Sequence, residues 1–362
     1  NVGLEIKQEM AVGELSSIKK SLLPIIAAMG GMIVPVILFL AVEHQDPAAM
    51  GAAIPMATDI AFALALIGAL GERVPTSLRV FIMALAVVDD IGGIIVIALF
   101  YSSGVAWTPL LIAFGILLII AMCGKIGIEH PGFYMAMFFI VWQFFLVSGI
   151  HTTIAGVLVA LCVPMTTKVR IDNLQAALHQ QFEELKCDHK ESGNAVVLSH
   201  DQLAVTHGLR DTLGRSVSPV QTIEHMLSPI VSFFILPLFA FVNAGVSFEG
   251  ISLDGIWGIP LAIVLGLFVG KPVGITLFTW LAIKFNLCPW PSGMTLRRLV
   301  PLSVFGGIGF TVSLFIATLS YGGTHPELLN QAKLGIFIGT ILSGVVGYVC
   351  LGRVLKKQNV ID

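Results

Sequence analysis

The sequence predicts an all-α protein that crosses a membrane many times. Of its 362 residues, 56% are hydrophobic and only 12% are charged, whereas about 25% of the residues in soluble domains are charged. Long stretches almost free of Asp, Glu, Lys and Arg recur along the chain, with the length of about 20 residues that a transmembrane helix needs. The 20 Lys and Arg are balanced by 22 Asp and Glu, so there is no basic excess and no nucleic-acid partner is expected.

Ten full spans are expected. They lie near residues 22–42, 52–70, 80–101, 105–123, 132–147, 150–165, 226–246, 256–283, 299–319 and 330–352. The stretch 131–164 carries no charge over 34 residues, which is too long for one helix. The Ser148-Gly149 pair is where this stretch is expected to fold into a hairpin of two helices.

Basic residues occur in alternate loops, which predicts the orientation of the chain because cytoplasmic loops collect Lys and Arg. The segments predicted to be cytoplasmic hold 18 of the 20 basic residues, and the intervening loops hold none. Both ends of the chain are therefore predicted to be cytoplasmic. The two remaining bases are Lys333, at the outer end of the last span, and Lys271, deep inside an apolar helix.

The membrane part is expected over 1–164 and 221–362, with a polar cytoplasmic insertion at 165–220. Apolar residues at helical spacing from Ile171 to Leu185 predict that part of this insertion is an amphipathic helix. A metal site at its histidines and cysteine is disfavoured, because no pair has the usual zinc spacing. The chain starts in what looks like the middle of a helix, so we expect that an N-terminal piece precedes it.

Four ionisable residues lie in the middle of apolar runs: Asp59, Asp89, Asp90 and Lys271. Each is costly in lipid, so such residues usually face a protein interior or a water-filled cavity and belong to an ion or proton path. A buried ion pair that only locks helices together is the structural alternative, but a single Lys leaves two of the three acids unpaired. Asp89 and Asp90 point about 100° apart around a helix, so one can meet Lys271 while the other faces a cavity.

Two spans are interrupted by residues that break helices. PMATDIAFA (55–63) places a proline inside one span, and FGGIGFTVS (305–313) places three glycines inside another. Each is the middle helix of a three-helix group, about 22–101 and 256–352. The two groups begin on opposite sides of the membrane, so they would be inverted repeats. Paired interrupted helices in inverted repeats point to a transporter's midplane site, although glycines also serve close helix packing.

The buried charges suit such a site. Half-helix ends that face each other leave uncompensated dipoles, and Asp59 and Lys271 have suitable signs to neutralise them. A buried carboxylate becomes neutral by binding either a proton or a cation, and competition between the two is the chemistry of an antiporter. Oxygen ligands without Cys or His suit Na⁺, Li⁺ or a similar hard cation.

Several segments resemble the bacterial NhaA family of Na⁺/H⁺ antiporters. The matching segments are ATDIAFAL (57–64), ALAVVDDIGGIIVIALFY (84–101), SGIHTTIAGVLV (148–159), LPLFAFVNAGV (236–246), GKPVGI (270–275) and GGIGFTVSLFIA (306–317). Inverted repeats are known from this same family, so the repeat pattern and the resemblance are not independent. The resemblance implies a twelve-helix fold in which two interrupted helices cross, with ten full spans and the end of another present in this chain.

The resemblance also implies roles for particular residues. Asp90 would be the principal ligand of Na⁺, and Asp89 its partner, either in proton exchange or by pairing with Lys271, which compensates charge. Thr58 and Asp59 would contribute to the cation and proton site from the interrupted helix. A pH-response region at the cytoplasmic mouth would comprise Glu5, Glu9, Glu224 and His225.

The resemblance further implies a secondary transporter rather than an enzyme. It would exchange cytoplasmic Na⁺ or Li⁺ for external H⁺, electrogenically and with activation at alkaline pH, in sodium and pH homeostasis. No cofactor is expected, because Na⁺ and H⁺ are the substrates. The protein would lie in the lipid of the bacterial inner membrane, with a cytoplasmic C-terminus, as a monomer or a homodimer.

Two other functions are weaker alternatives. An intramembrane aspartyl protease shares a proton between two carboxylates, but such proteases have a Gly-x-Gly-Asp signature that is missing before Asp90, and Lys271 would be unexplained. A cation channel needs a ring of ligands along a continuous pore, whereas buried titratable pairs and broken helices favour alternating access.

Overall fold

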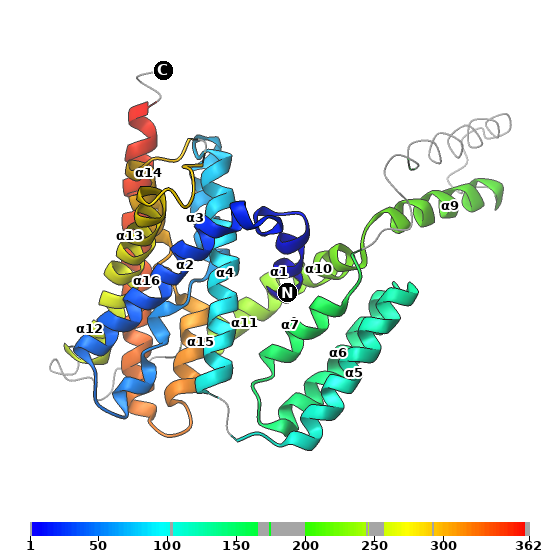
Figure 1. The fold of residues 1–362 in the computed structure, drawn as a ribbon, viewed down its shortest axis with the longest axis horizontal. Helices are drawn as coiled ribbons and strands as arrows, with labels where there is room; N and C mark the ends of the chain where they lie inside the picture. The colour runs from blue at the N-terminus through cyan, green and yellow to red at the C-terminus, as the bar shows by residue number, and fades with distance from the viewer. Residues whose placement is uncertain are drawn as a thin grey trace.

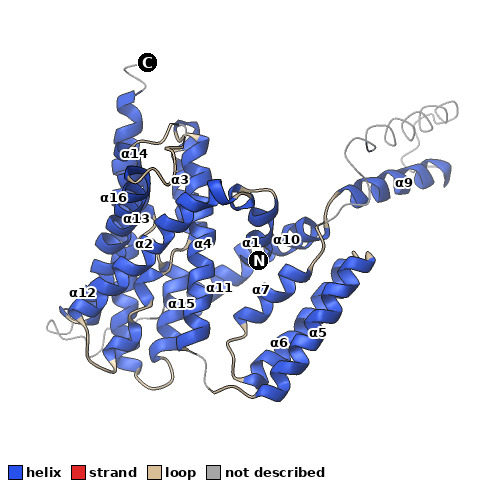
Figure 2. Ribbon diagram, viewed as in Figure 1, coloured by secondary structure: helices blue, strands red, loops and turns tan. Residues whose placement is uncertain are grey.

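The computed structural model describes residues 2–101, 104–165, 174, 200–243, 245, 257–291 and 293–358, and every regular element within them is a helix (Figures 1 and 2). In this part of the chain, eight helices are long and apolar enough to cross a membrane, and a bent pair makes a ninth. The predicted all-α membrane fold is therefore confirmed. The sixth expected span differs, because it is a helix of only ten residues, too short to cross a bilayer on its own.

The N-terminal third contains the first interrupted span. Its elements are α1 (Val2–Ala11), η1 (Glu14–Ser16), α2 (Ile18–Val42), η2 (Ala48–Gly51), η3 (Ile54–Met56), α3 (Ile60–Ala69), η4 (Gly71–Arg73) and α4 (Thr76–Phe100). The break follows η3, where Ala57 and Asp59 adopt extended backbone before α3 begins. The predicted interruption therefore consists of a short 3-10 segment, an extended link and a ten-residue half-helix.

The middle of the chain forms a separate group of helices. Its elements are α5 (Trp107–Ile126), α6 (Pro131–Ser148), α7 (Thr153–Cys162), α9 (His200–Ser216), α10 (Pro219–Ile230), the π-helical η5 (Val231–Ile235) and α11 (Leu236–Asn243). The hairpin lies where the sequence predicts it, since α6 ends at Ser148 and Gly149 has a left-handed φ of 79°. The expected amphipathic helix at 171–185 lies outside the described residues, Leu174 excepted. The described end of the insertion is α9, which extends away from the other helices (Figure 1).

The C-terminal part contains the second interrupted span. Its elements are α12 (Ile259–Val264), the π-helical η7 (Leu265–Gly270), α13 (Lys271–Lys284), α14 (Leu296–Phe305), α15 (Phe310–Tyr321) and α16 (Pro326–Gln358). Helices α14 and α15 are bent by 51° at the glycine-rich break. The π-helical turn precedes Pro272, whose missing N–H interrupts the regular helical hydrogen bonding.

The helices assemble into two bundles with a boundary between them. The first and last parts of the chain form the larger bundle (Figure 1). In this bundle α2 packs along α13. Three further helices, α12, α14 and α15, pack on α16. The second bundle consists of α5, α6 and α7, whose core also takes Leu4 from α1 and Ile223 from α10. Helices α1 and α10 thus lie at the boundary between the bundles, and α1 also packs on α4.

Candidate ion-binding site

The two interrupted spans cross each other at their breaks. The backbone N–H of Asp59 donates to the carbonyl oxygen of Ile308 at 2.6 Å. The hydroxyl of Thr58 donates to the carbonyl oxygen of Gly306 at 2.9 Å. The extended links of the two spans are therefore hydrogen-bonded directly to each other, and the four half-helix ends meet around this point.

A single carboxylate caps the N-termini of both half-helices, α3 and α15. One oxygen of Asp59 accepts from the backbone N–H of Phe62 at 3.2 Å. Its other oxygen accepts from the backbone N–H of Thr311 at 3.1 Å and from the Thr311 hydroxyl at 2.5 Å. Asp59 is only 3% exposed, so its negative charge opposes the positive ends of two helix dipoles in a dry environment.

Lys271 lies on the side of the crossing opposite to Asp59. Its side chain is fully buried, and its amine forms an ion pair with one oxygen of Asp89 and donates to the Thr58 hydroxyl at 2.7 Å. Thr58 in turn donates to Gly306, at the C-terminal end of α14, where the helix dipole is negative. The positive charge therefore lies on the side of the crossing where carbonyl groups end a helix.

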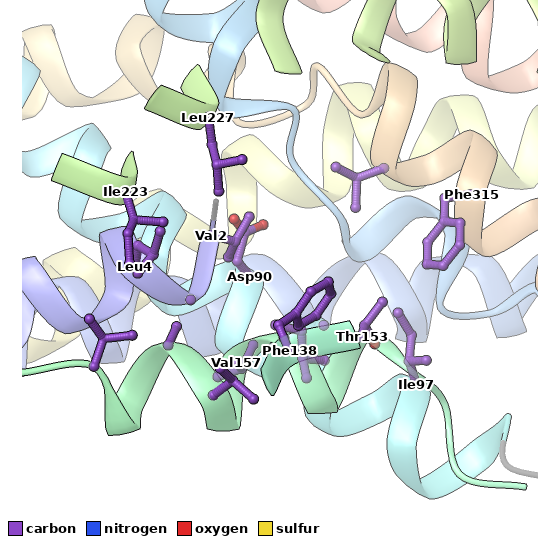
Figure 3. A pocket seen from close by; sticks show the side chains of 18 of the residues that line it. Val2, Leu4, Asp90, Ile97, Phe138, Thr153, Val157, Ile223, Leu227 and Phe315 are labelled. Carbon is purple, nitrogen blue, oxygen red and sulfur yellow. The ribbon is translucent and has the colours of Figure 1, made fainter. Parts of the chain in front are cut away.

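Asp89 and Asp90 reach a cavity of about 430 Å³ between the two bundles. Among the described residues that line it, they are the only charged ones, and most of the wall is apolar. Figure 3 shows the side chain of Asp90 between Leu227 and Ile223 on one side and Phe138 on the other. Asp90 makes no hydrogen bond or ion pair with the described residues. One oxygen of Asp89 also has no partner there, although it is buried.

The structure thus divides the predicted site residues into two sets. Asp89 and Asp90 lie on the cavity wall, and Asp89 alone is paired with Lys271. Thr58 and Asp59 do not line the cavity; their side chains hold the crossing together. A cation in the cavity would therefore meet carboxylate oxygens of two adjacent residues on α4. Lys271, which pairs with Asp89 at the crossing of the interrupted spans, does not line the cavity.

The predicted pH-response residues lie on two helices that pack together. Glu5 and Glu9 belong to α1, and Glu224 and His225 to α10. Burial raises the pKa of Glu5 above its ordinary value of 4.5, and the nearby carboxylate of Glu224 raises this pKa further. The same two helices supply one end of the cavity wall through Val2, Leu4, Ile223 and Leu227 (Figure 3).

Two threonines of the crossing were not singled out from the sequence. Thr311 shares the Asp59 carboxylate, and Thr340 on α16 accepts a hydrogen bond of 3.2 Å from the backbone N–H of Phe310, the first residue of α15. Thr311 follows the glycine break at a helix start, where a hydroxyl is a usual capping group. This position could have identified it, whereas Thr340 lies in an unbroken helix and carries no such signal.

Comparison with known proteins places these features in a family context. The family model described as Na⁺/H⁺ antiporter 1 matches residues 1–351. The chain is 56% identical over 360 residues to the Na(+)/H(+) antiporter NhaA of Porphyromonas gingivalis. This alignment covers 99% of the chain and 80% of the relative. The chain is 50% identical to the protein of the same name from Parabacteroides distasonis, over 99% of this chain and 80% of the relative. For the one from Salmonella arizonae the identity is 42%, over 96% and 78%.

Proposed function

Because the chain belongs to the Na⁺/H⁺ antiporter 1 family, we propose that it exchanges cytoplasmic Na⁺, or Li⁺, for external H⁺ across the bacterial inner membrane. Membership of this family makes the protein a membrane-embedded secondary transporter and not an enzyme. The aspartyl protease alternative is thereby set aside. The direction of exchange, the use of Li⁺ and the particular membrane belong to the proposal.

The observation that carries the proposal is the unequal environment of two adjacent carboxylates. Asp90 faces the cavity without a hydrogen-bond or ion-pair partner among the described residues, and Asp89 shares the wall while one of its oxygens pairs with Lys271. A cation that enters would take oxygen ligands from Asp90 and from the unpartnered oxygen of Asp89. Because the surrounding wall is apolar, a charged carboxylate there is stabilised by a cation or neutralised by a proton, but not by water alone. Na⁺ and H⁺ therefore compete for the same group.

Electrogenic exchange follows if two ionisable groups change protonation for each Na⁺. Asp90 is one of them. The second belongs to the pair of Asp89 and Lys271, since a cation on Asp89 weakens the attraction that holds the ammonium group in place. Release of Na⁺ to the other side lets both groups take up protons again. More protons than sodium ions then cross in each cycle, and the membrane potential contributes to the driving force.

The crossing of the interrupted spans would serve as the element that moves. Thr58, Asp59 and Lys271 neutralise the four half-helix ends, which lets non-helical backbone exist at membrane depth. In this proposal Thr58 and Asp59 act on the cation indirectly, because they hold the two interrupted spans in a fixed position relative to α4. The three-helix groups 22–101 and 256–352 would be inverted repeats that alternate access around it.

The protein would respond to pH at its cytoplasmic mouth. Glu5, Glu9, Glu224 and His225 form the candidate sensor, and activation would occur at alkaline pH. A cytoplasmic C-terminus follows from the distribution of basic residues. A homodimer stays a prediction of the family resemblance.

The experiment is proton release in sealed proteoliposomes. Vesicles that contain the chain are loaded at acid pH, Na⁺ is added outside, and internal pH is followed with a dye, with and without a potassium diffusion potential. Exchange that depends on Na⁺ and responds to the potential supports the proposal. A sodium current without proton movement would establish a channel instead.

The site assignment is tested in the same assay. Asp90→Asn keeps the size of the side chain but removes its charge and its proton, so Na⁺-dependent proton release should fall to the background. Asp46→Asn, in an exposed outer loop, is the matched control and should exchange normally. Near-normal exchange by Asp90→Asn would refute the role given to Asp90.

A further inference from the structure

Three hydroxyl groups join separate elements at the end of the molecule that the charge pattern predicts to be external. The Tyr101 hydroxyl, just after α4, donates to the carbonyl oxygen of Met50 in η2 at 2.7 Å. The Tyr321 hydroxyl, at the end of α15, donates to the carbonyl oxygen of Ala48 in η2 at 2.5 Å. Ser320 links the two helices directly, because its hydroxyl lies 3.0 Å from that of Tyr101. Helix α4, half-helix α15 and segment η2 are thus tied into a closed triangle.

This triangle lies one helical turn beyond the end of the Asp90 cavity. Ile97 and Ile316 line the cavity. Tyr101 follows Ile97 by four residues and Ser320 follows Ile316 by four, so each hydroxyl lies on the same helical face as a wall residue. A path from Asp90 to the outer side between α4 and α15 would therefore have to pass between Tyr101 and Ser320.

The triangle is also tightly packed. Tyr321 is fully buried and Ser320 is 7% exposed. A Cβ on Gly51 would overlap the Tyr321 hydroxyl, so η2 approaches the ring as closely as backbone can. Ser320 further contacts the carbonyl oxygen of Ile316 at 2.8 Å. The three elements are therefore in close contact here, and their separation would break all three hydrogen-bond links together.

We propose that Tyr101, Ser320 and Tyr321 are positioning residues that hold the outer end of the ion cavity closed, and so determine how often Asp90 becomes accessible from outside. The inference rests on the proposed exchange function, because a transporter must open this end in each cycle. The elements that the triangle joins are the ones that would move: α4 carries both aspartates, and η2 and α15 belong to the two interrupted spans.

The test measures access to the cavity from the outer side. A reporter cysteine is introduced as Ile97→Cys after the native cysteines are replaced by serine. Vesicles with the outer side exposed are treated with a membrane-impermeant maleimide, and the labelling rate is measured. One hydrogen bond changes a two-state ratio by roughly two- to tenfold, so Tyr101→Phe and Ser320→Ala should each raise this rate by about that factor. Tyr101→Phe combined with Tyr321→Phe should raise it more.

The matched control is Tyr348→Phe, which removes the hydroxyl of a partly exposed tyrosine on α16 and should leave labelling unchanged. Side-specific transport gives a second readout: the apparent affinity for Na⁺ on the inner side should weaken in the triangle variants, because the inward-facing state is less populated. A purely structural role predicts a lower melting temperature without either change. Should a Tyr321 variant fail to fold, the less buried Tyr101→Phe decides alone.

The outcomes separate this inference from the proposed function. Unchanged labelling and unchanged affinity in folded Tyr101→Phe, with normal exchange by the parent, would overturn the positioning role and leave the exchange function intact. Absence of exchange in the parent, with labelling that still responds to the substitutions, would overturn the exchange function and leave the closed outer end in place.

Discussion

Adjacent residues Asp89 and Asp90 have different surroundings because a helix turns by about 100° per residue. Asp89 meets Lys271 from α13, and Asp90 meets the cavity. The sequence predicts that the two acids differ, but not which of them is paired. That depends on where α13 lies relative to α4, and this position results from packing between segments about 180 residues apart, for which a single sequence carries no signal.

The buried ion pair of Lys271 and Asp89 gives a prediction about stability. Removal of one partner leaves the other charge buried and uncompensated, which typically costs about 3–5 kcal/mol. Lys271→Ala should therefore lower the melting temperature in detergent more than Lys271→Ala combined with Asp89→Asn. The measurement is thermal unfolding of both variants and of Asp89→Asn alone. Strictly additive losses would show that the two side chains are not coupled.

The shared cap at Asp59 gives a second prediction at this scale. A hydrogen bond to a charged group contributes about 1.5–3 kcal/mol. Thr311→Val keeps the shape of the side chain but leaves Asp59 without one of its three donors, so it should destabilise the protein by about that amount. Thr311→Ser retains the hydroxyl and is the matched control. Equal melting temperatures for the two variants would show that the Thr311 hydroxyl does not contribute to the cap.

Helices α2 and α13 approach each other more closely than side chains allow. A Cβ on Gly30 would overlap the carbonyl oxygen of Gly274, and a Cβ on Gly274 would overlap that of Gly30. Both glycines lie in the segments AMGGMIVP (28–35) and VGKPVG (269–274), which open the two three-helix groups. Both segments combine glycines with a proline, so the sequence marks both helices by the same composition. That they pack on each other is a finding of the structure, because glycine content does not specify a partner.

The close approach of α2 and α13 gives a prediction about the packing of these two helices. Gly274→Ala should destabilise the protein by about 1–3 kcal/mol or more, since backbone must shift to admit the methyl group. Gly115→Ala is the control: Gly115 also lies inside a long helix, but nothing lies within 4 Å of its added Cβ. That variant should be neutral or slightly stabilising, because alanine favours helices. Similar melting temperatures for both variants would contradict the close approach.

At the scale of the whole molecule, charge placement predicts most of the spans. Each of the ten expected spans has a helical counterpart, and the break points at 55–63 and 305–313 are where the sequence puts them. The short α7 was not predicted, because the charge-free stretch 131–164 carries no signal for how unequally the hairpin divides it. The boundary between the two bundles was not predicted either, since both of its faces are apolar and resemble lipid-facing surfaces.

That boundary connects the predicted pH-response residues to the cavity that Asp89 and Asp90 line. Helices α1 and α10 carry Glu5 and Glu224, and they also line the end of the cavity. Burial, and then the charge of Glu224, raise the pKa of Glu5, so Glu5 stays protonated to a higher pH than an ordinary carboxyl group. The neutral form of Glu5 stabilises the packed mouth fully below the ordinary pKa. This stabilisation is lost as the pH rises through the raised pKa, because a second negative charge then appears beside Glu224.

Neutralisation of Glu224 should therefore move the activation of exchange to lower pH. In Glu224→Gln burial still raises the pKa of Glu5, but the added repulsion from Glu224 is removed, so Glu5 loses its proton, and the mouth loosens, at a lower pH than in the parent. The maximal rate should change little, because Asp89 and Asp90 are untouched. The measurement is the initial rate of Na⁺-dependent proton release in proteoliposomes as a function of pH. Glu327→Gln, exposed at the start of α16, is the control and should reproduce the parent profile. A Glu224→Gln profile that superimposes on the parent's would exclude Glu224 from the control of exchange, and a shift to higher pH would contradict the role given to Glu5.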